Sequence, residues 1–433
     1  MLDEHVISEI NACVDTLREE LLKLVSDLVQ IPSISPKYPG VIKEDVLGGE
    51  SEVTAFLQPI MESIGLKTDR WEIEAGRANL VGVYTGTGDG KSLLFNGHVD
   101  VVPPGQEELW IKGDPWSGEI TEGRIYGRGA CDMKSGNAAA IIAVKAVLSA
   151  GIRPKGSVIL QDVVGEETQD TEVGTGAAIK RGYRTDAGIV VEPSAPPYRL
   201  GLLTASPGVL VMRVELKGKS AHTCVWDEVV RAGGAGDRVA VSAIDKALII
   251  YEGLRELDRE WGQTKVHPAF TRPGHFTLCP TTLVGGLNGI SYIPEECYID
   301  YAIWHSPNDP VNSVKAEIQD QIDRFAQTDS WLRKNPPKVE FTQWWPPYDV
   351  PADAPICQAV EKATKAAMGE PAKNYGFAAV NDAAFLNKEG IPTITLGPGD
   401  LANAHAYNEF VDIEEVIDAA KIYACIIAEW CGF

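Results

Sequence analysis

Leu93-Leu94-Phe95-Asn96-Gly97-His98-Val99-Asp100 is the stretch on which the interpretation of this chain depends. Its apolar run predicts a buried strand, and the run ends in a His-x-Asp step. Because side chains two apart on a strand point to the same side, His98 and Asp100 should lie together at the strand's carboxyl end, the usual ligand crevice of an open α/β sheet. An imidazole there can bind a metal while a carboxylate fixes its orientation. Taken alone, the step is also compatible with an ordinary polar loop.

Helical and strand patterns alternate on both sides of this stretch. They predict, in order, helices over 7–28 and 52–64, strands over 81–84 and 92–96, a helix over 136–150, and strands over 158–164 and 188–191. Strands that alternate with helices predict the α/β fold class, with a mainly parallel sheet covered by helices.

The pattern changes after Ser206-Pro207-Gly208. Alternating strands and one long helix follow, which predicts an inserted α+β lid or dimerisation domain. The Pro-Pro step in 333–337 is the expected exit, and α/β character then resumes with helices over 354–368 and 413–430 around a strand over 391–396. The predicted domains are the first part of a catalytic domain at 1–206, the inserted lid at 207–334, and the second part of the catalytic domain at 335–433.

The composition excludes several classes of partner. Lys and Arg number 39 against 61 Asp and Glu, a formal charge of -22, so neither nucleic acid nor an anionic membrane is an expected partner. No apolar run approaches the roughly 20 residues that span a bilayer. The acidic start lacks the features of a secretory signal, and the eight cysteines form no C-x-x-C pair. We expect a cytoplasmic protein with reduced thiols that acts on a small-molecule substrate.

Polar residues that could bind metal recur at strand ends and in Gly-rich turns: His98, Asp100, Asp132, Glu166, Glu167, Glu192 and His405. Carboxylates gathered in one crevice repel one another unless cations neutralise them. Imidazole with carboxylate suits zinc, cobalt or manganese, and one carboxylate can bridge two metals about 3.5–4 Å apart. Adjacent Glu166 and Glu167 point to different sides, so one can bind metal while the other acts as general base, although such a doublet is often just solvated surface.

Several runs together are similar to one known family, the metallo-aminoacylases and carboxypeptidases, which include acetylornithine deacetylase, succinyl-diaminopimelate desuccinylase and glutamate carboxypeptidase. The runs are Asn96-Gly97-His98-Val99-Asp100-Val101-Val102-Pro103, Gly127-Arg128-Gly129-Ala130-Cys131-Asp132-Met133-Lys134, Gly165-Glu166-Glu167, Val191-Glu192-Pro193-Ser194, Gly218-Lys219-Ser220-Ala221-His222 and Ala404-His405. They occur in the family's order and cover nearly the whole chain.

The resemblance implies two divalent metal ions, zinc with cobalt or manganese as alternatives, bridged by Asp132. It also implies that His98 and Glu192 would complete one metal site, and that Glu167 and His405 would complete the other.

Three further roles follow from the resemblance. Asp100 would orient His98, and Glu166 would be the general base. His222, on the inserted domain, resembles the family histidine that crosses a dimer interface to stabilise the oxyanion in the partner's site. We therefore expect a homodimer formed through the lid domain, although a lone histidine of this kind would usually be a surface residue.

The chain departs from the family where a substrate carboxylate is commonly gripped. The stretch 285–294 places Tyr292 where relatives supply an Asn, and Trp304 stands where they carry an Arg. In the catalytic-domain loop, Asp382-Ala383-Ala384-Phe385 replaces Asp-Gly-Arg-Phe. An aromatic ring cannot replace a guanidinium fork to a carboxylate, so Tyr292 and Trp304 predict a flatter or more apolar substrate. The alternative is that both aromatic residues only pack the lid. Asp382 is the third candidate for substrate binding.

Together these features predict a metal-dependent hydrolase of a C–N bond, most simply the amide of an N-acyl amino acid or peptide-like compound. A metal-bridging water, deprotonated toward Glu166, would attack the carbonyl carbon. The alternative is a hydrolytic deaminase of an aromatic or similar amine on the same metal site. An inactive metal-binding relative is a third interpretation, against which the intact Glu166 argues.

Overall fold

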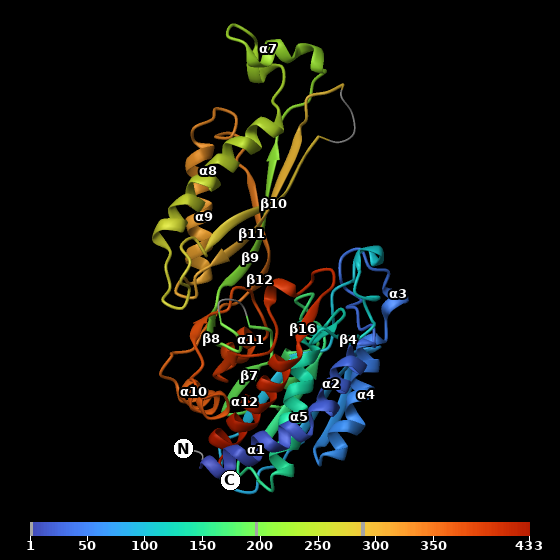
Figure 1. Cartoon of the computed structure of the whole chain (residues 1–433). Helices are drawn as coiled ribbons and strands as arrows, with labels where there is room; N and C mark the ends of the chain where they lie inside the picture. The colour runs from blue at the N-terminus through green and yellow to red at the C-terminus, as the bar shows by residue number, and fades with distance from the viewer. Residues whose placement is uncertain (1–2, 195–197, 287–290) are drawn as a thin grey trace. The chain divides into compact units, whose positions relative to one another are not determined.

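The structure, a computed structural model, describes residues 3–194, 198–286 and 291–433. The chain forms two compact units, Met1–Ala205 with Tyr348–Phe433, and Ser206–Pro347 (Figure 1). The first boundary, between Ala205 and Ser206, lies one residue before the predicted boundary at 206/207. The second lies well beyond the predicted 334/335, because strand β12 (Lys338–Trp345) pairs with β9 (Gly208–Lys217) in the sheet of the second unit. The Pro-Pro step therefore leads into a last strand of the insertion rather than out of it.

The first unit is built on a mainly parallel central sheet. Its strands are β1 (Lys67–Glu74), β2 (Arg77–Tyr84), β3 (Leu93–His98), β6 (Val158–Val163), β7 (Ala187–Val190), β8 (Leu202–Ser206), β13 (Tyr348–Asp349), β14 (Asn374–Gly376) and β15 (Thr393–Thr395). They lie in the order β1-β2-β6-β3-β7-β15-β8-β13, with β14 beside β8. The neighbours β6, β3, β7 and β15 are parallel, whereas β1 and β2 are antiparallel additions at one edge.

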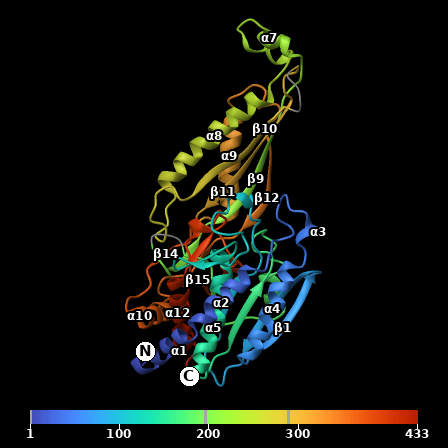
Figure 2. The ribbon, with the colours of Figure 1, turned by 45° about the vertical axis from the view of Figure 1, so that its right-hand side comes forward.

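Helices cover both faces of this sheet, which confirms the predicted α/β architecture. They are α1 (Glu4–Thr16), α2 (Arg18–Val29), α3 (Lys43–Val46), α4 (Gly49–Ser63), α5 (Ser135–Ser149), α6 (Thr175–Lys180), α10 (Pro355–Met368), α11 (Ala383–Lys388) and α12 (Ile413–Cys431). A small sheet of β4 (Ile120–Thr121), β5 (Arg124–Tyr126) and β16 (Phe410–Asp412) lies beside them. Helix α1 packs against α5 and α12 in both ribbon views (Figures 1 and 2).

Strand β3 shows how the sequence places a helix on each face. The Asn96 amide donates to the Thr175 hydroxyl of α6, whereas Gly97, on the opposite face, lies against Asn137 of α5. A Cβ at Gly97 would stand 1.8 Å from the Asn137 Oδ1, so only glycine allows α5 this close. Asn137 in turn donates to the His98 carbonyl at 2.8 Å. The glycine before His98 thus sets the end of the strand firmly on α5.

Within the described residues, no helix combines the length and the apolar character that crossing a membrane requires. All eight cysteines are free thiols, as expected from their scattered positions.

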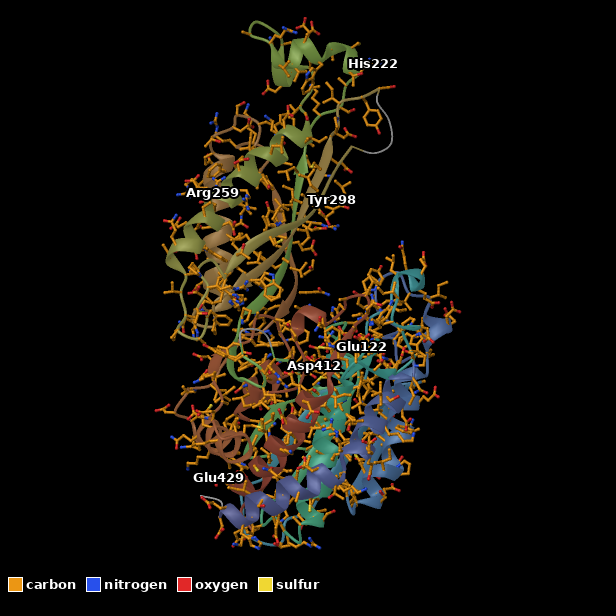
Figure 3. The ribbon with its side chains drawn as sticks, in the orientation of Figure 1. Glu122, His222, Arg259, Tyr298, Asp412 and Glu429 are labelled. Carbon is orange, nitrogen blue, oxygen red and sulfur yellow. The ribbon has the colours of Figure 1, made fainter. Side chains whose placement is uncertain are left out.

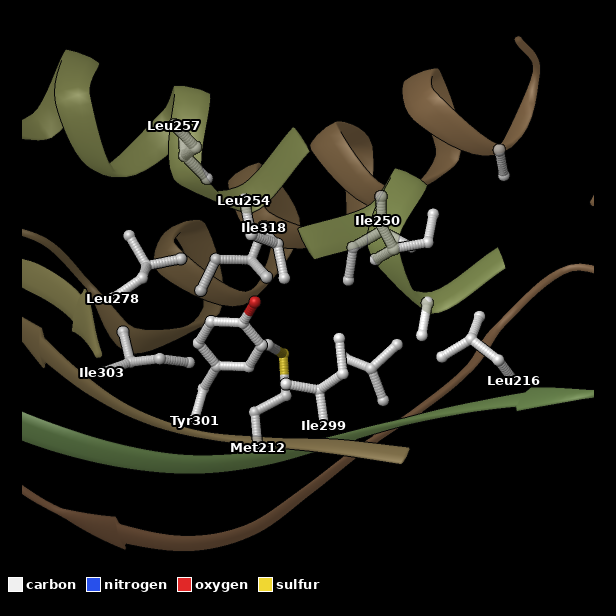
Figure 4. Packing of buried hydrophobic residues seen from close by; sticks show 14 of the residues in the cluster. Met212, Leu216, Ile250, Leu254, Leu257, Leu278, Ile299, Tyr301, Ile303 and Ile318 are labelled. Atoms are coloured by element: carbon white, nitrogen blue, oxygen red, sulfur yellow. The ribbon is translucent and has the colours of Figure 1, made fainter. Parts of the chain in front are cut away.

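The second unit is a four-stranded antiparallel sheet with helices on one face (Figure 1). It consists of β9, α7 (Trp226–Val230), α8 (Ala243–Thr264), β10 (Thr277–Gly285), β11 (Glu296–His305), α9 (Val311–Ala326) and β12, with strand order β10-β11-β9-β12. Burial alternates along β9 and β11, as it should in strands with one covered face. The buried residues of these strands meet those of α8 and α9 in a single apolar core (Figure 4).

One polar atom in this core gives a stability prediction. The Tyr301 hydroxyl is buried under α8 and α9 and has no hydrogen-bond partner among the residues that the structure describes (Figure 4). The equally buried Tyr423 hydroxyl of the first unit donates to the Leu396 carbonyl at 2.6 Å. A buried polar group without a partner costs stability, whereas a made hydrogen bond contributes about 1 kcal/mol.

We therefore expect Tyr301→Phe to leave the free energy of unfolding unchanged or to raise it by up to about 1 kcal/mol. The matched control Tyr423→Phe should lower it by about 1 kcal/mol. Urea unfolding followed by circular dichroism measures both. A clear loss of stability in Tyr301→Phe would show that its hydroxyl has a partner.

Candidate active site

Three parallel neighbours, β6, β3 and β7, end at the same edge of the central sheet. His98 is the last residue of β3 and pairs with Val163 at the end of β6. The chain then continues from β6 to Glu166 and Glu167, and from β7 to Glu192. Carboxyl ends of parallel strands form the ligand crevice of such sheets, so the topology itself gathers these side chains.

His98 lies at the centre of the resulting cluster. Its Nε2 is 3.0 Å from the Asp132 Oδ1, 3.4 Å from the Glu192 Oε1 and 3.9 Å from the Glu166 Oε2. His98, Asp132 and Glu192 are all buried. The ligand atoms of His98, Glu166 and Glu192 lie within 4.8 Å of one another, as do those of His98, Asp132 and Glu167.

His405 approaches the same cluster from the second half of the unit. Its Nε2 is 3.4 Å from the Asp132 Oδ2 and 3.1 Å from the Glu167 Oε2. The two oxygens of Asp132 thus face two different histidines, Oδ1 toward His98 and Oδ2 toward His405. A carboxylate shared in this way suits a bridge between two cations.

Asp100 holds His98 in a different way from the one predicted. The Nδ1–H of His98 donates to the backbone carbonyl of Asp100 at 2.8 Å, whereas the nearer carboxylate oxygen lies 3.8 Å away. That carboxylate instead accepts the backbone N–H groups of Gly165 at 2.9 Å and Glu167 at 3.3 Å. Asp100 therefore fixes the imidazole through its main chain, which leaves Nε2 free as a ligand, and fixes the turn of the two glutamates through its side chain.

Burial and mutual repulsion control the ionisation of the cluster. Burial raises the pKa of Glu166 well above its ordinary value, and the charges of Glu192 and Glu167 add to the effect. Burial also raises the pKa of Glu192, to about 8. For His405, burial lowers the pKa, but hydrogen bonds to Asp132 and Glu167 outweigh it and raise the pKa to about 11. The cluster therefore favours positive charge between its carboxylates.

These residues fit a pair of divalent cations. The set offers two imidazoles and three carboxylates, His98, His405, Asp132, Glu167 and Glu192, with Asp132 placed between the histidines. Imidazole and carboxylate ligands without thiolate are typical of catalytic zinc, cobalt or manganese sites rather than of structural zinc.

The sequence profile of Peptidase family M20/M25/M40 matches residues 94–429. The chain belongs to this family. The resemblance found in the motifs is thereby confirmed, and membership identifies the chain as a hydrolase of carbon–nitrogen bonds that uses divalent metal ions.

Other members of the M20/M25/M40 family resemble the chain over its full length. It is 31% identical to an N-formyl-4-amino-5-aminomethyl-2-methylpyrimidine deformylase of Halalkalibacterium halodurans, over 100% of this chain and 99% of that one. It is 32% identical to the deformylase of the same name from Bacillus subtilis, over the same shares. Human carnosine dipeptidase 1 has the same fold, with a TM-score of 0.72 at 16% identity over 99% of both chains.

Three residues predicted for the site belong to the second unit of this M20 chain, so their part in the site stays a prediction. His222 and Tyr292 lie side by side, because their backbones form an isolated antiparallel bridge. His222 lies at one end of the unit near α7 (Figure 3). Residues 287–290 of the predicted Tyr292 loop lie outside the described residues. Trp304 is half-buried on the sheet face opposite the helices, so it is not part of the core in Figure 4.

Asp382 is buried in the first unit, where its Oδ2 accepts the Thr175 hydroxyl. Its Oδ1 has no hydrogen-bond partner among the described residues. Asp382 is therefore linked to Asn96 of β3 through the Thr175 hydroxyl. Its contact with substrate stays a prediction.

Proposed function

We propose that this M20 enzyme hydrolyses the amide of a small N-acylated amine, with an N-formyl group on an aminomethylpyrimidine or a similar flat heterocycle as the preferred substrate. The observation that carries the proposal is the position of Glu166. It lies beside the His98 cluster but farther from Nε2 than Asp132 or Glu192, where a carboxylate serves as base rather than as closest ligand. The two similar deformylases support the choice of substrate.

In the proposed reaction, Glu166 accepts a proton from water as the water oxygen bonds to the amide carbon. Glu166 then returns this proton to the amide nitrogen as the C–N bond breaks, which releases a carboxylic acid and an amine. Divalent metal ions, when bound, polarise the carbonyl and lower the pKa of water. His98, Glu192, Glu167, His405 and Asp132 would hold these ions, and Asp100 fixes both His98 and the turn that carries Glu166.

A substrate panel tests this proposal. Metal-reconstituted protein would be given N-formyl and N-acetyl aminomethylpyrimidines, N-acetyl amino acids and dipeptides, with formate, acetate, amine and ammonia measured. We expect formate and amine in equal amounts, and a kcat/KM for the formyl compound about 10–200-fold above the acetyl one, because one methyl group in a fitted pocket has that effect. Ammonia released from the ring would establish a deaminase instead, and preference for acyl amino acids or dipeptides would overturn the substrate assignment.

We also propose that the enzyme is a homodimer in which His222 serves the partner's active site. The backbone N–H of Cys224 donates to the His222 Nδ1 at 3.1 Å, so the neutral ring carries its proton on Nε2. The side chain is exposed at one end of the second unit, with Nε2–H available to donate to a developing oxyanion. A twofold contact is isologous, so each subunit would donate to the other.

Mixing two inactive variants tests this exchange. His222→Ala and Glu166→Gln subunits would be combined under conditions in which subunit exchange is verified. In a mixed dimer one active site keeps its own Glu166 and receives His222 from the partner, so activity should return to at most half per dimer. If exchanged dimers stay inactive, His222 acts within its own chain or has no catalytic part.

A further inference from the structure

A buried carboxylate that the motifs did not single out joins the two chain segments that supply Asp132 and His405. Glu409 lies four residues after His405, and its side chain is fully buried. Its Oε1 accepts three backbone N–H groups, those of Gly129 at 2.9 Å, Cys131 at 3.0 Å and Asp132 at 3.2 Å. One carboxylate oxygen thus holds the turn that presents Asp132.

The other oxygen of Glu409 reaches the second segment through an arginine. Its Oε2 forms an ion pair with the Arg128 Nη1, and the Arg128 Nη2 donates to the His405 carbonyl at 3.2 Å. Arg128 is itself buried, and its planar guanidinium directs one nitrogen at each of these two acceptors. The chain of contacts runs from the Asp132 backbone through Glu409 and Arg128 to the backbone of His405.

The backbone of His405 needs such support. Its φ is 61°, in the left-handed region that residues other than glycine rarely adopt, and such conformations persist only where surrounding contacts hold them. The Arg128 contact to its carbonyl is one of these. The neighbouring pairing of Phe410 with Tyr126 and the bond from the Gly127 N–H to the Glu409 carbonyl at 2.9 Å fasten the same two segments together.

We infer that Glu409, with Arg128, is a positioning residue for the metal centre that sets the distance between Asp132 and His405. The inference rests on the proposed ligand set. Outer contacts of this kind typically change metal affinity by about 10–100-fold when they are lost. A glutamine at 409 keeps the shape of the side chain but cannot accept hydrogen bonds on both sides, because its NH₂ group would face either the three N–H donors or the guanidinium.

The test measures zinc affinity without any substrate, by competition between apoprotein and a chromophoric chelator. We expect Glu409→Gln to bind zinc at least about tenfold more weakly than the unchanged chain, and Glu409→Asp, which keeps the charge, to regain part of the loss. Arg128→Lys is the second variant, because an ammonium cannot span both acceptors. Arg128→Lys should also weaken zinc binding. If Glu409→Gln does not fold, the zinc affinity of Arg128→Lys tests the inference.

Asp329→Asn provides the matched control in the second unit. Asp329 accepts the N–H groups of Trp331 and Leu332 and pairs with Lys246, so it has the same kind of partners as Glu409 away from any predicted ligand. Its loss should reduce stability and leave zinc affinity unchanged, since metal affinity of a fully folded protein is insensitive to modest destabilisation. Wild-type affinity in the folded Glu409 and Arg128 variants would overturn the inference. Failure of the unchanged chain to bind zinc would overturn the proposed metal site instead.

Discussion

Glu166→Gln should lower kcat by at least about 10²-fold and leave the metal content near normal. The amide cannot accept the proton of the attacking water, so proton transfer is lost while the shape of the side chain is kept. The ligands nearest to His98 are Asp132 and Glu192, and this substitution leaves both in place. Steady-state kinetics together with elemental analysis of the purified variant measure the two effects separately.

The adjacent glutamate supplies the control for this prediction. The Oε2 of Glu167 lies 3.1 Å from the His405 Nε2, so Glu167→Gln should lose bound metal as well as activity. The two substitutions change the same atoms one residue apart, and only the second should alter metal content. A Glu166→Gln protein that keeps its full rate would show that another group is the base.

Removal of metal by a chelator should abolish activity, and zinc, cobalt or manganese should restore it. It should also lower the melting temperature, because a ligand that binds only the folded state stabilises it, by about 2.7 kcal/mol at a hundred times its Kd. In the apoprotein burial and mutual repulsion raise the pKa values of Glu166 and Glu192 despite the nearby His98, so these carboxylates are costly without metal. Activity assays and thermal unfolding before and after dialysis against chelator measure both effects.

Asp132→Asn is the control for metal removal. Because Asp132 faces both histidines, its loss should disable both predicted metal positions, and the chelator should then change the melting temperature little. Zinc at about two ions per subunit in active protein would agree with the proposal, in which Asp132 is a ligand shared by two metals. Active protein without any divalent metal would refute the assigned ligands.

That these side chains lie together was predictable, because sheet topology determines their positions. His98, Glu166 and Glu192 each follow an apolar strand, and a parallel arrangement of those strands brings their ends together. Asp132 and His405 belong to no strand, so the sequence indicated them as polar residues near Gly-rich turns and through the family motifs. Which atom of Asp100 would touch His98 depends on the backbone path after β3, and no residue pattern encodes that path.

Other features depended on contacts distant in sequence. The single helix predicted over 7–28 is two helices that meet at Leu17, whose ψ of 4° leaves the helical range. Strand β12 follows a Pro-Pro step and alternates polar with apolar residues, and only its pairing with β9 assigns it to the second unit. The sequence did not indicate a role for Glu409, because three of its partners are backbone N–H groups of residues distant in sequence. Its place four residues after His405 was the available hint.

The position of β15 between β7 and β8 has a consequence for the order in which the protein can be completed. Ribosomes deliver β7 and β8 early and β15 late, after the whole of Ser206–Pro347 has been made. The continuous second unit can therefore finish folding while the central sheet of the first still waits for an inner strand. A nascent chain halted at Pro347 carries His98 and Asp132 but neither His405 nor Glu409, so the proposed ligand set can be complete only after translation of the last segment.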